Sequence, residues 1–158
     1  MKIHIREAEL TDLKQVSQFA KALTEYETKK YKDDSYDPTW GERSPGREFF
    51  ARQIVSDNGV VLLASVEGSI VGYLVCKVHD VEWRIPKKTA EIINLFVLPE
   101  HRSKGIGSKL IERFKDDVKK LDAKRITVMQ HVKNSEGLRF YERHGFKKAI
   151  LTLEIPLP

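Results

Sequence analysis

The pattern of apolar and polar residues predicts secondary structure along the whole chain, beginning with a strand and a long helix. Apolar and polar residues alternate over Lys2–Arg6, which predicts the strand. Thr11 can cap the following helix, in which apolar residues recur at spacings of three and four: Leu13, Val16, Phe19, Ala20 and Leu23. From Glu25 to Gly41 this spacing is lost, and we expect a long polar loop or a short frayed helix there.

A second helix and a strand hairpin follow in the pattern. Ser44 and Pro45 are typical of a helix cap and a first helical residue, and the pair Asn58-Gly59 ends that helix. Two strands over Val60–Val66 and Ile70–Val81 are then separated by a short turn that contains Gly68, which predicts a hairpin.

The second half of the chain alternates strands and helices. A near-continuous apolar run ends at Pro99 and predicts a strand covered on both faces. The elements expected here are the strand Glu91–Leu98, the helix Gly105–Leu121, the strand Arg125–His131, a short helix capped by Asn134 and closed by Gly145, and one or two strands in Phe146–Ile155. This order predicts one α/β domain over residues 1–158, with a mixed, mostly antiparallel central sheet flanked by helices. A parallel strand pair is expected where the helix Gly105–Leu121 connects two strands.

Length and composition restrict the class of protein. The chain has 158 residues, of which 41% are hydrophobic and 32% charged, enough for one core. No apolar run approaches the roughly 20 residues that span a bilayer, and the first residues lack the pattern of a cleaved leader, so we expect a cytoplasmic protein with no membrane partner. One cysteine, Cys76, excludes an internal disulfide, and the five histidines show no paired ligand spacing, so no metal is implied.

Charge gives the first indication of function. The net charge is +5, and the segment His101–Arg125 alone carries nine basic and four acidic residues, a local net charge of +5. A positive field of this size suits an anionic partner, either a phosphorylated small molecule or a nucleic acid. The alternative is a solvated basic helix face without a ligand.

A glycine-containing turn at the start of the helix Gly105–Leu121 suits an anion. The first amides of a helix have no acceptor within the helix, and the helix dipole places partial positive charge beside them. Gly105 and Gly107 remove side chains that would keep a phosphate from the backbone, and Arg102 and Lys104 add full charges. Two better-known glycine loops do not fit. The spacing that the Walker pattern requires is absent, and Leu110 stands where the dinucleotide fingerprint has its third glycine.

These residues resemble the GNAT superfamily of acyl-coenzyme A-dependent N-acetyltransferases. The family signature is a strand followed by Arg/Gln-x-x-Gly-x-Gly/Ala at a helix start, which matches Arg102 to Gly107, and the preceding Leu95–Pro99 matches its Leu-x-Val-x-Pro run. A second stretch, Asn134–Phe146, is similar to the later Asn…Phe-Tyr…Gly-Phe motif of the family. Ser103 and Gly137 are mild departures from the usual residues.

The resemblance implies a GNAT-like fold in which a splayed parallel strand pair forms the cleft for acetyl-CoA, the cosubstrate. In the family the pyrophosphate lies on the loop amides, and the pantetheine arm pairs with the strand like an extra strand. A backbone N–H near Leu95 or Phe96 would then face the thioester oxygen. The residues so implied to bind the cosubstrate are Leu95, Phe96, Val97, Arg102, Ser103, Lys104, Gly105, Ile106, Gly107, Ser108, Asn134 and Tyr141.

Acetyl transfer to an amine requires a base and an acid. Tyr141 stands where the family usually has its general acid, although core packing beside Phe140 is the alternative. Glu91 is the candidate base, because some members carry a glutamate at this place and because a carboxylate in an apolar strand is costly. It can equally be an ordinary residue at the start of a strand. Asn94 or His131 could instead hold a water that relays the proton.

The acceptor side is indicated only by charge. The segment Glu25–Glu42 contains six acids and three lysines in an otherwise basic protein, and in the family this loop often borders the acceptor site. We therefore expect a cationic amine, such as a polyamine or a lysine side chain, unless the segment is simply a solvated loop. The candidate residues are Tyr31, Asp33, Asp34, Tyr36, Asp37 and Trp40.

The sequence thus predicts an N-acetyltransferase that joins acetyl-CoA and a primary amine by direct attack in a ternary complex. Two other functions fit less well: a catalytically silent acyl-CoA sensor, and a nucleic-acid-binding module that uses the basic surface. The second is disfavoured because the basic residues lack interleaved aromatic residues that stack on bases. The terminal strands allow a homodimer without requiring one.

Overall fold

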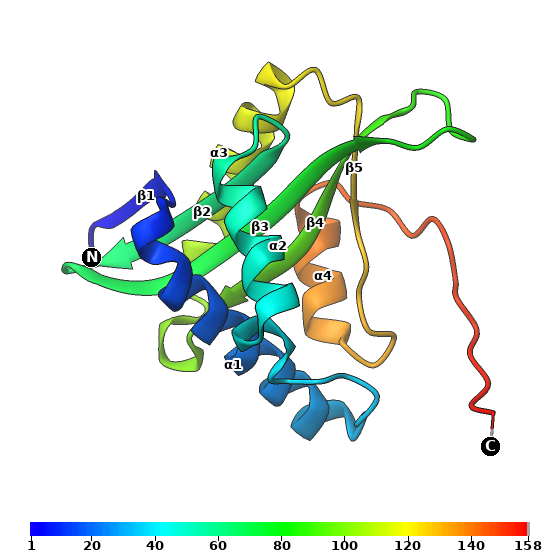
Figure 1. Cartoon of the computed structure of the whole chain (residues 1–158), viewed down its shortest axis with the longest axis horizontal. Helices are drawn as coiled ribbons and strands as arrows, with labels where there is room; N and C mark the ends of the chain where they lie inside the picture. Colours follow the sequence, from blue (N-terminus) through cyan, green and yellow to red (C-terminus); the bar gives the residue numbers. More distant parts are fainter. Residues whose placement is uncertain (158) are drawn as a thin grey trace.

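A five-stranded sheet organises the structure, a computed structural model that describes residues 1–157 (Figure 1). The strands are hydrogen-bonded in chain order, β1-β2-β3-β4-β5; the pairs among β1, β2, β3 and β4 are antiparallel, and β5 is parallel to β4. The strands are β1 (Ile3–Glu7), β2 (Gly59–Val66), β3 (Ser69–Asp80), β4 (Lys88–Val97) and β5 (Arg125–Val128). The helices are α1 (Leu13–Tyr31), α2 (Ser44–Val55), α3 (Ile106–Lys120) and α4 (Ser135–Arg143). The expected mixed, mostly antiparallel α/β architecture is confirmed.

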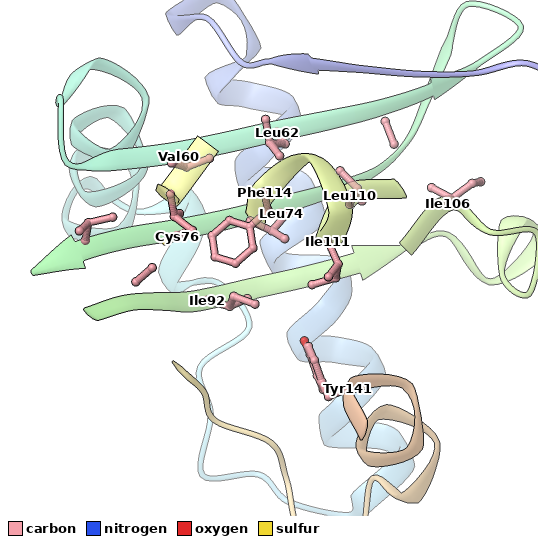
Figure 2. Packing of buried hydrophobic residues seen from close by; sticks show 14 of the residues in the cluster. Val60, Leu62, Leu74, Cys76, Ile92, Ile106, Leu110, Ile111, Phe114 and Tyr141 are labelled. Carbon is pink, nitrogen blue, oxygen red and sulfur yellow. The ribbon is translucent and has the colours of Figure 1, made fainter. Parts of the chain in front are cut away.

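Helices cover both faces of the sheet because successive side chains of a strand point to opposite faces. On β2, Leu62 and Ala64 join α3 in one core cluster, which Figure 2 shows, while Val61 and Leu63 join α1 and α2 in another. The continuous apolar runs in β2 and β3 follow from this, since both faces of each strand are buried. Within residues 1–157, none of the helices combines the length and the apolar character needed to cross a membrane.

The first helix is longer than the sequence indicates. The pattern predicts a loop or a short frayed helix from Glu25, but α1 continues to Tyr31 and ends at Lys32, whose φ of 53° is left-handed. The residues from Glu25 to Lys30 are good helix formers or are tolerated in helices. The regular apolar spacing therefore ends where α1 stops packing against the core, and the helix itself continues. The second helix also starts slightly differently, with Ser44 as its first residue and Arg43 as the cap.

The chain after β5 departs most from the prediction. The strand β5 ends at Val128, three residues before the expected His131, and Phe146–Ile155 forms no strand. A strand needs a neighbour for its backbone groups. In this structure Phe146 still packs against Tyr141, but the chain after it leaves the body of the molecule (Figure 1). Its apolar side chains Ile150, Leu151, Leu153 and Ile155 are 71–85% exposed.

Candidate active site

A cleft opens where β4 and β5 separate. The two strands pair only from Thr89 to Ile92 and from Arg125 to Val128, whereas β4 continues to Val97 with β3 as its sole strand partner. The backbone of the segment after Ile92 therefore has an edge without a neighbouring strand. A cavity of about 970 Å³ lies along this edge, bordered by α1, the start of α3 and α4. The expected splayed parallel pair is thus present, and the sequence-predicted residues Leu95, Phe96 and Val97 line the cleft.

The loop before α3 presents its amides to this cleft. Among the residues that the structure describes, none of the six backbone N–H groups from Ser103 to Ser108 donates a hydrogen bond to a protein acceptor. The turn requires left-handed backbone at Ser103 (φ 58°) and at Gly105 (φ 81°), the N-cap of α3. Free amides at a helix N-terminus form an anion-binding site. Ser103, Gly105, Ile106, Gly107 and Ser108 all line the cleft, as predicted.

The two cations of the loop have structural partners as well. Arg102 Nε donates to the Val97 carbonyl at 2.9 Å, and its guanidinium lies 4.2 Å from the ring centroid of Tyr26. Lys104 Nζ donates to the Glu100 carbonyl at 2.8 Å, and Lys104 is not among the residues that line the cleft. Arg102 therefore joins β4 to α1 at the edge of the cleft, in addition to contributing positive charge there.

Gly107 has a packing role that the sequence analysis does not indicate. We expected it to let a phosphate approach the backbone, but a Cβ at this position would lie 3.2 Å from two ring atoms of Phe140. That distance is shorter than an ordinary van der Waals contact. The missing side chain thus makes room for α4, which packs its Phe140 ring against the start of α3.

Tyr141 projects from α4 toward β4 (Figure 2). The side chain is 7% exposed and packs edge-on against Phe140 and Phe146, at ring distances of 5.3 and 5.2 Å. It also lines the cleft. Burial raises the pKa of Tyr141 above that of a free phenol, and the Glu27 carboxylate raises it further, so the hydroxyl keeps its proton at neutral pH. The packing interpretation therefore describes this residue, and its role as the acid stays a prediction.

Glu91 lies outside the cleft. Its Oε2 is 3.1 Å from Lys77 Nζ and 3.0 Å from His79 Nε2, and it is not among the residues that line the cavity. The cost of a carboxylate in the strand is thus offset by an ion pair on the sheet. The position of Glu91 does not support its expected role as the base.

Glu27 is the carboxylate that α1 brings to the cleft instead. Desolvation raises the pKa of Glu27, and the neighbouring His131 partly opposes that shift. The prediction missed it because α1 was expected to end or fray at Glu25. A signal was present, since Glu27 lies four residues after Leu23 and four before the buried Tyr31, and so continues the apolar face of the helix.

Other cleft residues from α1 and α4 were also missed. Lys30 Nζ donates to Glu136 Oε2 at 2.7 Å and thereby joins α1 to α4 across the cleft. Arg139 and Arg143, one helical turn apart, add two exposed cations to its lining. Asn134 lines the cleft as predicted, while its Oδ1 accepts the Gly137 amide at 2.9 Å as the cap of α4.

The structure separates the predicted acceptor residues into two groups. Tyr31 is 4% exposed and stacks on His131, with 4.5 Å between ring centroids, and Asp33 Oδ2 lies 3.4 Å from His131 Nε2. Both residues therefore contact His131, whose charge also acts on the pKa of Glu27. None of the six predicted residues lines the cleft, and Asp34, Tyr36, Asp37 and Trp40 are in addition exposed.

Local contacts account for part of the second group. Asp37 forms an ion pair with Arg43, and Trp40 packs against Phe49 and Phe50. Stabilising the loop before α2 is thus a sufficient structural role for Asp37 and Trp40.

Comparisons with known proteins agree with this geometry. The sequence matches the Acetyltransferase (GNAT) family over residues 20–146. It is 24% identical over 151 residues to a spermidine N(1)-acetyltransferase from Thermoplasma acidophilum, covering 93% of this chain and 89% of that one. A solved structure of a tetramutant of the BH1408 protein from Bacillus halodurans is similar with a TM-score of 0.80 and 25% identity, covering 98% and 99% of the two chains.

A PaiA N-acetyltransferase from T. acidophilum, solved in complex with coenzyme A, has the same fold. The TM-score is 0.77 at 24% identity, over 93% of this chain and 91% of that one. The family match covers most of the chain. The chain therefore belongs to the GNAT family, and it is an acetyl-CoA-dependent N-acetyltransferase.

Proposed function

We propose that the protein transfers the acetyl group of acetyl-CoA to a primary amine that attacks directly while both substrates are bound. The observation that supports this most strongly is the continuity of the cleft. It joins a helix N-terminus with free amides to a buried phenol on one side and a half-buried carboxylate on the other. These groups are the anion site, the acid and the base that such a reaction needs.

The residues at one end of the cleft fit a coenzyme A diphosphate. The amides from Ser103 to Ser108 have no protein acceptor among the described residues, and the helix dipole of α3 favours negative charge beside them. Arg139 and Arg143 supply cations from the opposite wall. The free edge of β4 around Leu95–Val97 can pair with the amide groups of the pantetheine arm as a further strand would.

When bound, acetyl-CoA supplies an activated acetyl thioester, and the chain provides the proton transfers. Glu27 removes a proton from the ammonium group of the acceptor, directly or through a water molecule, because only the neutral amine is a nucleophile. A backbone N–H near Leu95 or Phe96 stabilises negative charge on the thioester oxygen. Tyr141 donates a proton to the departing sulfur, for which its protonated state at neutral pH is suited.

The charge at the acceptor end suggests a cationic amine. Glu27 and Asp33 both lie near His131, and Lys133 N–H donates to His131 Nδ1 at 3.1 Å. The two carboxylates supply negative charge at this end, which attracts a positively charged acceptor. One relative in the comparison acts on spermidine, a substrate of this chemical class.

A thiol-release assay tests the proposal. Purified protein is incubated with acetyl-CoA and a panel of polyamines, aminoglycosides, peptides with free amino termini and lysine-containing peptides, and mass spectrometry identifies the acetylated product. We expect release with at least one cationic amine, and initial-rate lines that intersect when both substrates are varied, as in a ternary complex. Parallel lines would contradict direct attack, and preference for neutral over cationic amines would contradict the assignment of the acceptor end.

A further inference from the structure

The cleft contains one acidic side chain that the proposed reaction does not use. Within residues 1–157, six lysine, arginine and glutamate side chains line the cleft, and four of them are basic, as a site for an anionic coenzyme requires. They are Lys30, Arg102, Arg139, Arg143, Glu27 and Glu136. Glu27 is the proposed base. Glu136 is the second carboxylate in this basic cleft, and no step of the reaction requires it.

Glu136 belongs to the first turn of α4, but its carboxylate binds a residue of another helix. An acid near a helix N-terminus interacts favourably with the helix dipole. Here Glu136 Oε2 also accepts a hydrogen bond from Lys30 Nζ of α1, at 2.7 Å. The glutamate side chain is 68% exposed, and ion pairs as exposed as this one contribute little to stability. Stability alone is therefore a weak reason for a carboxylate at this place.

A series of contacts connects Glu136 to the loop before α3. Lys30 Nζ also donates to the Tyr26 hydroxyl at 2.8 Å. The guanidinium of Arg102 lies over the ring of Tyr26, 4.2 Å from its centroid. Arg102 directly precedes Ser103, whose amide is the first of the loop amides that have no protein acceptor among the described residues. Glu136 therefore belongs to the set of charges that surrounds the loop.

The charge of Glu136 acts on two arginines of the cleft. The hydrogen bond from Lys30 holds the pKa of Glu136 below that of an ordinary glutamate, and the positive charges of Arg139 and Arg102 lower it further, so the carboxylate is ionised at neutral pH. Interactions between charges are mutual, so Glu136 partly neutralises the same cations in return. Both arginines line the cleft that is proposed to hold the coenzyme. The attraction of this cleft for an anion is therefore weaker than its arginines alone would make it.

We propose that Glu136 competes with the coenzyme diphosphate for the cations of the cleft, and thereby lowers the affinity for acetyl-CoA and for coenzyme A alike. This inference rests on the proposed function, which places the diphosphate on the amides of Ser103–Ser108. In the free protein, Glu136 is the anion that Lys30 binds. When the coenzyme binds, its diphosphate enters a field that already contains this carboxylate, and like charges repel.

The consequence for the reaction is a faster release of product. Acetyl-CoA and coenzyme A carry the same diphosphate, so Glu136 weakens the binding of both by the same factor. A cleft with the cations alone would retain coenzyme A after the transfer, and the retained product would inhibit the next cycle. Glu136 therefore determines affinity and limits product inhibition, and it has no part in the proton transfers.

Isothermal titration calorimetry of the full chain with coenzyme A tests the competition through a matched pair of variants. Glu136→Gln and Glu142→Gln each remove one negative charge from α4, but Glu142 is exposed and is not among the residues that line the cleft. We expect Glu136→Gln to lower the dissociation constant about 3- to 10-fold at low salt, the size of the repulsion between one exposed charge and a nearby diphosphate. This gain should shrink at about 0.5 M salt, because salt screens exposed charges.

The control variant separates a local effect from one of net charge. Glu142→Gln should change the dissociation constant by less than about twofold, because its charge lies outside the cleft. An equal gain in both variants would reduce the effect to net charge and overturn the proposal. Unchanged affinity in Glu136→Gln, with coenzyme A still bound by the wild type, would refute the competition and leave the proposed function intact.

Lys30→Met distinguishes competition from a structural clamp between α1 and α4. It breaks the same ion pair as Glu136→Gln, but it leaves the carboxylate in the cleft and removes a cation. We expect the two variants to change the affinity in opposite directions: Glu136→Gln binds coenzyme A more tightly and Lys30→Met binds it less tightly. If both bind it less tightly, the ion pair only holds the helices together, and the competition is refuted. A wild type that binds no coenzyme A would refute the coenzyme site itself, and this inference with it.

Product inhibition checks the consequence for turnover. It is measured from the initial rate at which the acetylated amine forms, because added coenzyme A would itself give a thiol signal. The inhibition constant of coenzyme A against acetyl-CoA should fall in Glu136→Gln by the same factor as the dissociation constant, and it should stay unchanged in Glu142→Gln. An inhibition constant that does not fall in Glu136→Gln would refute the role of this residue in product release.

Discussion

Replacing Gly105 by alanine tests whether the loop before α3 holds the coenzyme diphosphate. Gly105 has a φ of 81°, and a Cβ added there would meet no heavy atom within 4 Å. The substitution therefore causes no clash and acts only through backbone strain, because a side chain disfavours left-handed backbone by about 1–2 kcal/mol. The loop can relieve this strain by rotating its peptide units, which turns the free amides of Ser103–Ser108 away from the cleft.

The strain sets the size of the expected effect. Coenzyme A must restore the strained loop in order to bind, so its dissociation constant should rise by about 5- to 30-fold, the equivalent of 1–2 kcal/mol. Isothermal titration calorimetry with coenzyme A measures this directly. The Michaelis constant for the amine should not change, because Gly105 belongs to the loop before α3 and not to α1, which carries Glu27.

Gly68 provides a matched control. It has a φ of 83°, a Cβ there also meets nothing within 4 Å, and it lies in the turn between β2 and β3. Gly68→Ala should lower the free energy of unfolding by about 1–2 kcal/mol, measured in urea, and leave coenzyme A affinity unchanged. Unchanged affinity in Gly105→Ala as well would refute the assignment of the loop amides to the diphosphate.

Three further substitutions test the acid, the base and the core. Tyr141→Phe should lower kcat in the thiol-release assay by about 100-fold or more while coenzyme A affinity is kept, and undiminished turnover would exclude Tyr141 as the acid. In the wild type, kcat/KM for the amine should fall on the acidic side of its pH profile as Glu27 is protonated, at a higher pH than for an ordinary glutamate because the pKa of Glu27 is raised. Glu27→Gln should remove this fall. If the fall persists in the variant, the base is another residue. Because the fold holds this proton more tightly than the unfolded chain, stability falls as pH rises through the pKa of Glu27, and the glutamine variant should lack this fall. Leu62→Ala, at a side chain with 0% exposure between the sheet and α3, should cost about 2–5 kcal/mol in urea unfolding, and a loss below about 1 kcal/mol would contradict the packing described.

The parts of the site that depend on local sequence could be predicted. The apolar run before Pro99, the glycine turn and the amphipathic α3 each carry their own signal, and the parallel connection through α3 follows from their order. The cap of α4 by Asn134 is equally local, since its side chain accepts the amide of Gly137 three residues later. These segments contain most of the residues predicted to bind acetyl-CoA.

The parts that depend on distant contacts could not be predicted. Glu91 is predicted as the base because some family members carry a glutamate at this place and because its strand is apolar. Pairing with Lys77 and His79 across the sheet explains the carboxylate instead, and strand register is not visible in a single sequence. Glu27 was missed because the end of α1 was inferred from lost apolar spacing. The strand expected in Phe146–Ile155 has the correct alternation, but a strand forms only where a partner exists, and the structure places none beside it.

The contact between Gly107 and Phe140 couples the loop before α3 to α4, so that the loop cannot be exchanged alone. Phe140 occupies the space that a side chain at residue 107 would fill, and the next residue of the same helix is Tyr141. A loop transplanted from a relative with alanine at this place would push the α4 ring and the neighbouring phenol with it. A variant that exchanges this loop in order to change selectivity for the acyl-CoA donor should therefore exchange α4 together with it.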